Sequence, residues 1–168
     1  MWTGTVVSIY IAPSATESTK SVDKVRAVPG KGLEGDRYFQ GRGTWSTHPG
    51  SGRQVTLIES ETLEALEREP GPHFAPGEHR RNLVTSGVPL NHLIDCNFRI
   101  GEVVFRGMRL CEPCEHLEKL TQPGVKMALL HRGGLRADVI REGTIRVGDT
   151  VEETAENGSV SDLRVNQD

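Results

Sequence analysis

Short runs of alternating polar and apolar residues, separated by glycine and proline, are the feature that most constrains the fold of this chain. Alternation with a period of two predicts β-strands that bury one face. The 168 residues include 19 glycines and nine prolines, which favours a β-rich fold with many turns and few long helices. We predict strands over residues 3–11, 54–59, 98–100, 103–105 and 108–110, with further strands over 135–151, broken at Gly143 and Gly148.

The alternation in the first predicted strand, over residues 3–11, predicts which of its side chains share a face. Strict alternation places Val6, Ser8 and Tyr10 on one face of the strand. The same alternation places Val7, Ile9 and Ile11 on the other face. The glycine-rich segment 28–38 is predicted as backbone that bends sharply or passes close to another group.

Three short helices are predicted between these strands. The first spans residues 61–69, with Ser60 as its N-cap and with Leu63 and Leu66 toward the core. A second helix is predicted over Glu115–Leu120, and a third over 125–131. None of the three is long enough to dominate the fold.

The length of the chain fits a single domain. We expect this domain to span residues 1–152 and a polar, mobile tail to follow over 153–168. The net charge of −3 does not favour binding to a nucleic-acid duplex. Locally, however, Arg80-Arg81 and the group Arg132, Arg136, Arg141 and Arg146 concentrate positive charge suited to a small anionic ligand.

The chain begins without a recognisable leader segment and has no apolar run of membrane-spanning length. We therefore expect a cytoplasmic protein without a membrane partner. In that compartment Cys111 and Cys114 should rest as thiols, and a structural disulfide is the weaker interpretation.

The motif Cys111-Glu-Pro-Cys114 places two of the three cysteines three residues apart, just ahead of a predicted helix. Cysteines at this spacing can form a reversible disulfide, share a metal ion, pack as small apolar side chains or present one reactive thiolate. A zinc site would need four ligands, which Cys111, Cys114 and His116 could supply only with a distant residue such as Cys96 or His131. A single functional thiolate at Cys114, close to a helix N-terminus, fits the local chemistry better.

Two further motifs carry charge. Arg80-Arg81-Asn82 follows a loop and opens a predicted strand, so it could bind phosphate oxygens and a neutral polar edge. Asp36-Arg37 follows a tight glycine turn and could either position a site or form an ordinary salt-bridged loop. Taken alone, each motif also fits a purely structural role. Phosphate-binding glycine loops and a Gly-x-Ser-x-Gly nucleophile motif are absent from the sequence.

In chain order these segments resemble the MOSC domain, a family named for the C-terminal domain of molybdenum-cofactor sulfurases. The resemblance rests on an ordered set of segments within residues 3–152: Gly32–Arg37, Arg53–Ile58, Arg80–Gly87, Phe98–Gly101, Cys111–Cys114 and Gly143–Asp149. It implies a distorted, mostly antiparallel β-barrel of the kind also found in the pyruvate-kinase barrel domain, with a few short helices.

The resemblance also implies a site. In molybdenum-carrying members the second cysteine of the motif coordinates the metal of a molybdopterin cofactor, and Cys114 matches that residue. Arg80 and Asn82 match residues that hold the cofactor, Arg81 lies between them, and Asp36 and Arg37 match a motif that borders the same pocket. Cys111 and His116 would then be supporting residues.

The activity implied is reduction of N-hydroxylated compounds, with electrons from a separate reductase. The first alternative is a non-redox carrier that passes sulfur or molybdenum cofactor to an apo-enzyme. The second is a zinc-stabilised interaction module built on Cys111, Cys114 and His116. Pyridoxal phosphate is not expected, because no lysine of this chain lies in a recognisable site for it.

Overall fold

A closed β-barrel forms the body of the molecule in the computed structural model, which describes residues 1–48 and 50–154. Within these residues seven strands pair in a continuous circuit, in the order β11-β7-β8-β9-β5-β6-β1 and back to β11. The strands are β1 (Thr3–Ile11), β5 (Val55–Glu59), β6 (Leu83–Ser86), β7 (Asn97–Ile100), β8 (Val103–Leu110), β9 (Leu135–Arg141) and β11 (Thr150–Glu153). Neighbours in the circuit are antiparallel except β5 and β6, which are parallel. The predicted distorted, mostly antiparallel barrel is therefore confirmed.

The barrel interior is filled by one apolar cluster to which every strand of the circuit contributes. At its centre the rings of Phe98 and Phe105 stack with centroids 5.5 Å apart, and both side chains are fully buried. These two phenylalanines come from the hairpin β7–β8, in which they are directly paired. Two of the eight aromatic residues in the chain thus form a stacked pair inside the barrel.

Strand β1 departs from strict alternation at a β-bulge. Its pairing with β6 runs from Val6 opposite Thr85 directly to Ser8 opposite Val84, so Val7 has no partner in that ladder. The extra residue reverses the faces of the strand beyond it. Val6 and Ile9 consequently both lie in the barrel core, while Val7 is 46% exposed. The prediction that Val7 shares a face with Ile9 was wrong for this reason.

A small second sheet covers one end of the barrel. It consists of β10 (Gly143–Arg146), β3 (Lys24–Val28) and β4 (Gly32–Leu33), in that order. A further short strand, β2 (Lys20–Val22), pairs with the end of β1. Strands β2, β3 and β4 were not predicted, because strands of two to five residues between turns carry little periodic signal.

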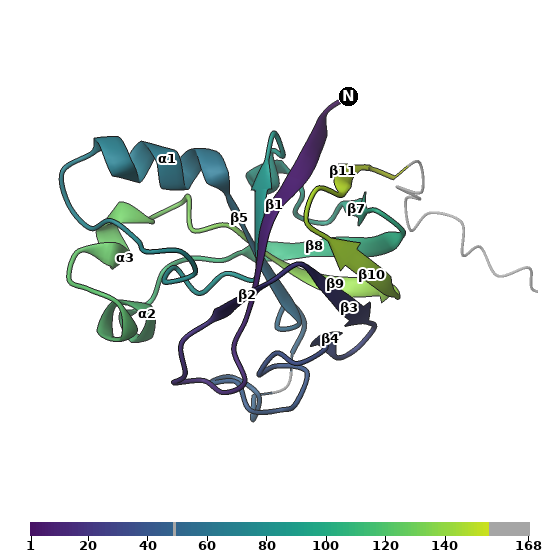
Figure 1. Ribbon diagram of the computed structural model, residues 1–168, viewed down its shortest axis with the longest axis horizontal. Coiled ribbons are helices and arrows are strands. Elements are labelled where there is room, and N and C mark those ends of the chain that lie inside the picture. The colour runs from purple at the N-terminus through teal and green to yellow at the C-terminus, as the bar shows by residue number, and fades with distance from the viewer. Residues whose placement is uncertain (49, 155–168) are drawn as a thin grey trace, which may run out of the picture.

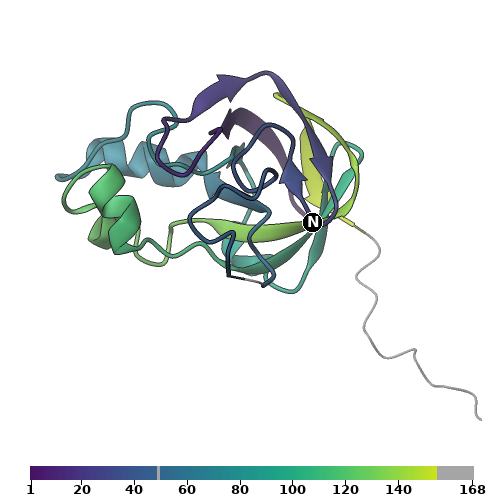
Figure 2. The ribbon, with the colours of Figure 1, turned by 90° about the horizontal axis from the view of Figure 1, so that it is seen from below.

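Three short helices gather on one side of the barrel, away from β7, β10 and β11 (Figures 1 and 2). They are α1 (Ser60–Arg68), α2 (Glu115–Leu120) and α3 (Val125–Ala128), close to the predicted ranges. A second apolar cluster joins them to the outer face of the sheet, with Leu66 of α1, Leu117 of α2 and Ile58 of β5 among its members. Ser60 is the first residue of α1, and Glu59 occupies the N-cap position.

A single 3-10 turn, Leu90–His92, links β6 to β7. In the described residues no helix is both long and apolar enough to cross a membrane. The predicted tail begins at Glu153, which is still the last residue of β11; residues 155–168 lie outside the described residues.

Because of the bulge, we expect substitutions of Ile9 and of Val7 in β1 to have unequal effects on the free energy of unfolding. Ile9→Ala should lower the free energy of unfolding by about 2–5 kcal/mol, because it leaves a cavity in the barrel core. Val7→Ala should change it by no more than about 0.5 kcal/mol, because the side chain faces solvent. Urea unfolding monitored by fluorescence measures both values. Equal costs for the two substitutions would show that β1 alternates without a bulge.

Candidate functional site

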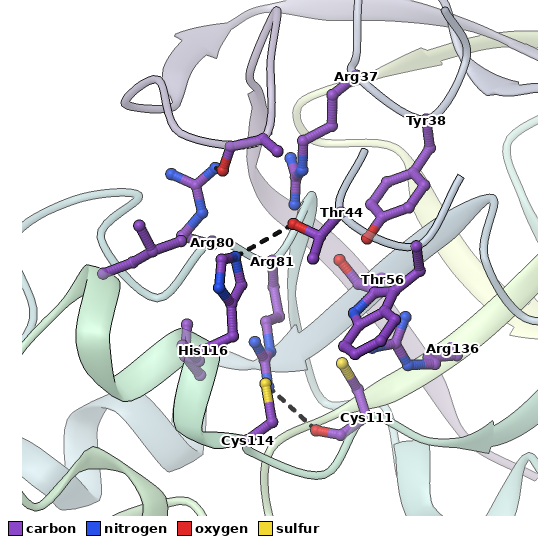
Figure 3. A pocket seen from close by; sticks show the side chains of 14 residues that line it. Arg37, Tyr38, Thr44, Thr56, Arg80, Arg81, Cys111, Cys114, His116 and Arg136 are labelled. Carbon is purple, nitrogen blue, oxygen red and sulfur yellow. Dashed lines mark hydrogen bonds between the residues drawn. The ribbon is translucent and has the colours of Figure 1, made fainter. Parts of the chain in front are cut away.

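An open pocket lies where four loops meet β5 and β9 beside helix α2 (Figure 3). Its empty volume, with the adjoining open solvent included, is about 480 Å³. The described lining includes four arginines and no aspartate or glutamate: Arg37, Arg80, Arg81 and Arg136. The pocket is therefore strongly cationic, although the whole chain carries a net charge of −3.

Both cysteines of the Cys-x-x-Cys motif line this pocket, and Figure 3 shows both sulfur atoms directed toward the cavity. They are not equivalent. Cys111 is 2% exposed and directly follows β8, whereas Cys114 is partly exposed and occupies the N-cap position of α2. Both are free thiols, as is Cys96. Of the pair, Cys114 is thus the thiol that a ligand in the cavity can reach more readily.

Arg81 fixes the position of the cysteine loop. Its side chain is 6% exposed and donates three hydrogen bonds to backbone carbonyls. Nη2 binds the carbonyl of Cys111 at 3.0 Å, Nε that of Gly133 at 2.9 Å and Nη1 that of His79 at 3.3 Å. One guanidinium therefore ties the segment before β6 to the loops that precede α2 and β9.

The loop before β9 approaches the cysteine loop so closely that a side chain would not fit. A Cβ atom at Gly133 would lie 2.3 Å from the carbonyl oxygen of Cys111, and one at Gly134 would lie 1.8 Å from the carbonyl oxygen of Leu57. Gly134 also has a φ of +105°, a conformation that L side chains rarely adopt. This glycine pair lets the carbonyl of Gly133 reach Arg81.

The side chain of Arg80 binds a different loop from that of Arg81, and the backbone conformation of Arg80 is unusual. Its φ of 62° is in the left-handed region that non-glycine residues seldom occupy. Its guanidinium donates to the carbonyls of Ala15 and Glu17, at 2.9 and 2.8 Å, and lines the pocket. Burial, followed by the nearby charge of Arg37, lowers the pKa of Arg80 below its usual value. The positive charge of Arg80 is therefore held at a cost that a bound anion would relieve.

Asp36 and Arg37 form a buried ion pair, but only Arg37 lines the pocket. Oδ1 of Asp36 accepts hydrogen bonds from the Ala12 amide at 3.0 Å and from Arg37 Nη1 at 3.2 Å. Asp36 is fully buried behind the wall, whereas Arg37 lines the pocket. Asp36 thus holds the loop and orients Arg37, which presents its charge to the cavity.

Asn82 also lies behind the pocket wall. Its Oδ1 accepts hydrogen bonds from the amide and hydroxyl of Thr56, at 3.1 and 3.2 Å, and its Nδ2 donates to the carbonyl of Tyr10 at 3.1 Å. The side chain is 2% exposed and joins β1, β5 and β6. Thr56, which Asn82 positions, lines the pocket. That Asn82 itself touches a cofactor stays a prediction.

His116 lies on α2 beside Cys114, and its Nε2 is 3.1 Å from Oγ1 of Thr44. Within the described part of the chain, no three or more histidine, cysteine, aspartate or glutamate side chains are grouped so that they could hold a metal ion. This finding argues against the zinc-stabilised module that Cys111, Cys114 and His116 would form. It is compatible with a metal held by one thiolate and completed by a cofactor's own ligands.

Eight lining residues were not among the predicted site residues, including Tyr38, Thr44, Trp45 and Arg136, of which Arg136 was noted only within a cluster of arginines suited to a small anionic ligand. Tyr38 follows the Asp36-Arg37 pair directly, and Thr44 and Trp45 come from the polar loop that the sequence leaves without periodic signal. Arg136 had a signal, because it stands between the buried residues Leu135 and Ala137 in an alternating strand. Alternation shows that Arg136 faces outward from the barrel, but not that this part of the outer surface forms the pocket wall.

The architecture and the cysteine–arginine pocket can now be compared with known proteins. The sequence model of the MOSC domain family matches residues 45–152 of this chain. This range contains Arg80–Asn82 and both cysteines of the motif. The chain belongs to the MOSC domain family. Asp36 and Arg37 precede the matched range, although the structure places Arg37 in the same pocket.

Solved structures of bacterial proteins share this fold. The YuaD protein from Bacillus subtilis is similar with a TM-score of 0.73 and 22% identity, over 90% of this chain and 97% of that chain. YiiM from Geobacillus stearothermophilus gives a TM-score of 0.68 and 18% identity, over 90% of this chain and 75% of its own. YiiM from Escherichia coli gives 0.65 and 20%, over 96% and 72%. The comparison with curated proteins gives no match.

The three carbonyl contacts of Arg81 predict a large structural cost for its removal. Arg81→Ala should lower the free energy of unfolding by about 3 kcal/mol, because three buried carbonyls lose a charged donor. Arg106→Ala is a matched control, since the ion pair of Arg106 with Asp95 is at the surface, and it should cost less than about 1 kcal/mol. Urea unfolding curves measure both. Similar costs for the two variants would contradict the role given to Arg81.

His79 predicts a dependence of stability on pH. Burial, and then the charge of Arg81, lowers the pKa of His79 from 6.5 to about 3. Its Nδ1 accepts a hydrogen bond from the Arg81 amide at 3.0 Å, which needs the neutral ring. Below pH 6.5 the unfolded chain binds a proton that the folded chain refuses, so stability falls as pH falls from 6.5 toward 3.

At pH 5 this effect amounts to about 2 kcal/mol of lost stability relative to pH 7.5. His79→Asn keeps an acceptor near the position of Nδ1 and cannot titrate. The difference in unfolding free energy between pH 7.5 and pH 5 should therefore be about 2 kcal/mol smaller in His79→Asn than in the wild-type protein. An unchanged difference would mean that His79 is protonated in the folded state.

Proposed function

We propose that the protein binds molybdenum cofactor through the thiolate of Cys114 and reduces N-hydroxylated compounds with electrons from a separate reductase. The observation that carries this proposal is a partly exposed thiol in a pocket whose charged lining residues are arginines. A soft thiolate suits a thiophilic metal, and the arginines suit the phosphate of molybdopterin. Membership of the MOSC domain family supports the choice of this cofactor among anionic ligands.

Different residues of the pocket would bind different parts of such a ligand. Cys114 would bind the metal, and Arg37 and Arg80 would bind the phosphate from the side of the 13–19 loop. Arg81 would contribute its charge from the pocket lining while its hydrogen bonds hold the loops, and Asn82 would act from behind the wall through Thr56. When bound, the cofactor would supply two-electron oxygen-atom chemistry, with the protein providing orientation and electrostatics.

The same residues can prepare the pocket for reduction of an N-hydroxyl group. The Nε2 atom of His116 lies 3.1 Å from Oγ1 of Thr44, and this contact places its imidazole beside Cys114, where it can form a hydrogen bond with a group bound in the pocket. The pocket opens to solvent along one side, so a substrate can enter while the buried Cys111 stays covered. Cys111 therefore supports the loop that carries Cys114, with its carbonyl held by Arg81.

The proposal is tested by metal and pterin analysis of protein made in a molybdenum-replete host. Wild-type protein should carry molybdenum and pterin in equal amounts, and Cys114→Ser should reduce the molybdenum to background while the fold remains intact. Cys96→Ser is the matched control, because Cys96 lies outside the pocket and should leave the metal content unchanged. Cys111→Ser should retain measurable molybdenum.

The outcomes separate the alternatives. Molybdenum at the wild-type level in Cys114→Ser would overturn the assignment of the metal ligand. A mass increase of one sulfur atom on Cys114 without molybdenum would instead favour the sulfur carrier. Loaded protein should reduce benzamidoxime when reduced methyl viologen supplies electrons, and loaded protein that lacks this activity would favour the cofactor carrier.

A further inference from the structure

Two arginines of like charge stand directly opposite each other beside the pocket. Arg109 of β8 and Arg136 of β9 are cross-strand partners in the antiparallel ladder. Like charges in this arrangement destabilise a sheet. Arg136 also lies opposite Thr56 of β5, so it stands between two strands with its charge beside the cavity.

The protein supplies little to offset this concentration of charge. Among the described residues, the guanidinium of Arg136 makes no hydrogen bond or ion pair, and that of Arg109 donates to the carbonyl of Ser51 at 2.8 Å. Asp138 is the acidic residue beside Arg109, and its Oδ1 already accepts a hydrogen bond from the Gly52 amide at 2.8 Å. Arg136 is half-buried and Arg109 is exposed, so the remaining cost is the repulsion between the two charges, and a bound anion would relieve it.

A third arginine adds to the same group. Arg53 lies close enough to Arg109 to act on its charge, and its Nη1 donates to the carbonyl of Trp45 at 2.9 Å. Its Nε is buried and lacks a hydrogen-bond partner within the described residues. Burial, followed by the charges of Arg136 and Arg53, lowers the pKa of Arg109. Arg53 and Arg136 therefore both act on the charge of Arg109, beside which the carboxylate of Asp138 also lies.

This group is separate from the arginines assigned to the cofactor phosphate. Figure 3 shows Arg136 on the side of Cys111, across the cavity from Arg37 and Arg80. The two cationic regions thus flank the cysteines. Molybdopterin has a single phosphate, so one cofactor phosphate cannot occupy both regions at once.

We propose that Arg53, Arg109 and Arg136 form a second anion site, which binds a phosphate group on the substrate. The inference rests on the proposed function in one respect: it makes the substrate a phosphorylated N-hydroxylated compound, bound with its phosphate on the Cys111 side of the cavity. The recognising chemistry is a fork of guanidinium donors that fits phosphate oxygens. A nucleotide extension of the cofactor would present the same chemistry, and the experiment must tell the two sources apart.

The first measurement uses cofactor-free protein and inorganic phosphate at low ionic strength, followed by calorimetry. Arg109→Gln should weaken phosphate binding at one of the sites by about tenfold or more, since a charged hydrogen-bond donor is lost. Arg106→Gln is the matched control: Arg106 is on the same strand but pairs with Asp95 at the surface, so binding should not change. Arg109→Lys keeps the charge without the fork and should show an intermediate affinity.

Thermal melting distinguishes loss of the phosphate site from misfolding of the variant. Without phosphate, Arg109→Gln should melt at the same temperature as the wild-type protein or higher, because the repulsion with Arg136 is relieved. With phosphate, it should gain less thermal stability than the wild type. Wild-type affinity in Arg109→Gln, or an equal loss in Arg106→Gln, would overturn the site. Neither measurement depends on molybdenum, so failure here is distinguishable from failure of the proposed function.

The source of the anion is decided on cofactor-loaded protein. Phosphate that still binds in an Arg109-dependent manner supports a substrate phosphate. Loss of that binding, together with a nucleotide released from the extracted cofactor, would assign the site to the cofactor and overturn the assignment to the substrate.

Discussion

The hydrogen bonds of Arg81 are the interaction on which the arrangement of the pocket depends. The guanidinium is buried and binds the carbonyls of His79, Cys111 and Gly133, which belong to three separate segments of the chain. A buried cation that is bound to carbonyls rather than to a carboxylate keeps its positive charge uncompensated by an acid. Arg81 therefore contributes twice, since it sets the position of the cysteine loop and adds to the cationic field of the cavity.

The motif residues separate into those that face the cavity and those that build its wall. Arg37, Arg80 and Cys114 present charge or sulfur to the pocket, whereas Asp36 and Asn82 use their side-chain polar atoms to hold neighbouring strands and loops. This division explains why the motifs contain polar residues in pairs or triplets. One member acts on the ligand, and its neighbour fixes the backbone from which the first one projects.

The main strands and the short helices could be predicted from the sequence, because alternation between glycine turns and capped apolar stretches are local patterns. The closed, mostly antiparallel barrel was expected from the resemblance to the MOSC domain. The bulge at Val7 could not, since it arises from the register of β1 against β6 and leaves no mark in the residues themselves. The cysteines and Arg80 were found through their motif. The contribution of Arg136 and Trp45 depends on which outer surface of the barrel the loops cover, and that is a property of the tertiary fold.

The closure of the barrel has a consequence for when a ligand can be captured. Strand β1 completes the circuit by pairing residues Thr3–Thr5 with Thr150–Glu152 of β11. The pocket likewise draws on residues from Ala15 to Arg136. Almost the whole of the described chain must therefore be synthesised before either the barrel or the pocket exists, and contacts so distant in sequence form slowly. A ligand of this pocket would therefore be captured after synthesis, once the barrel has closed.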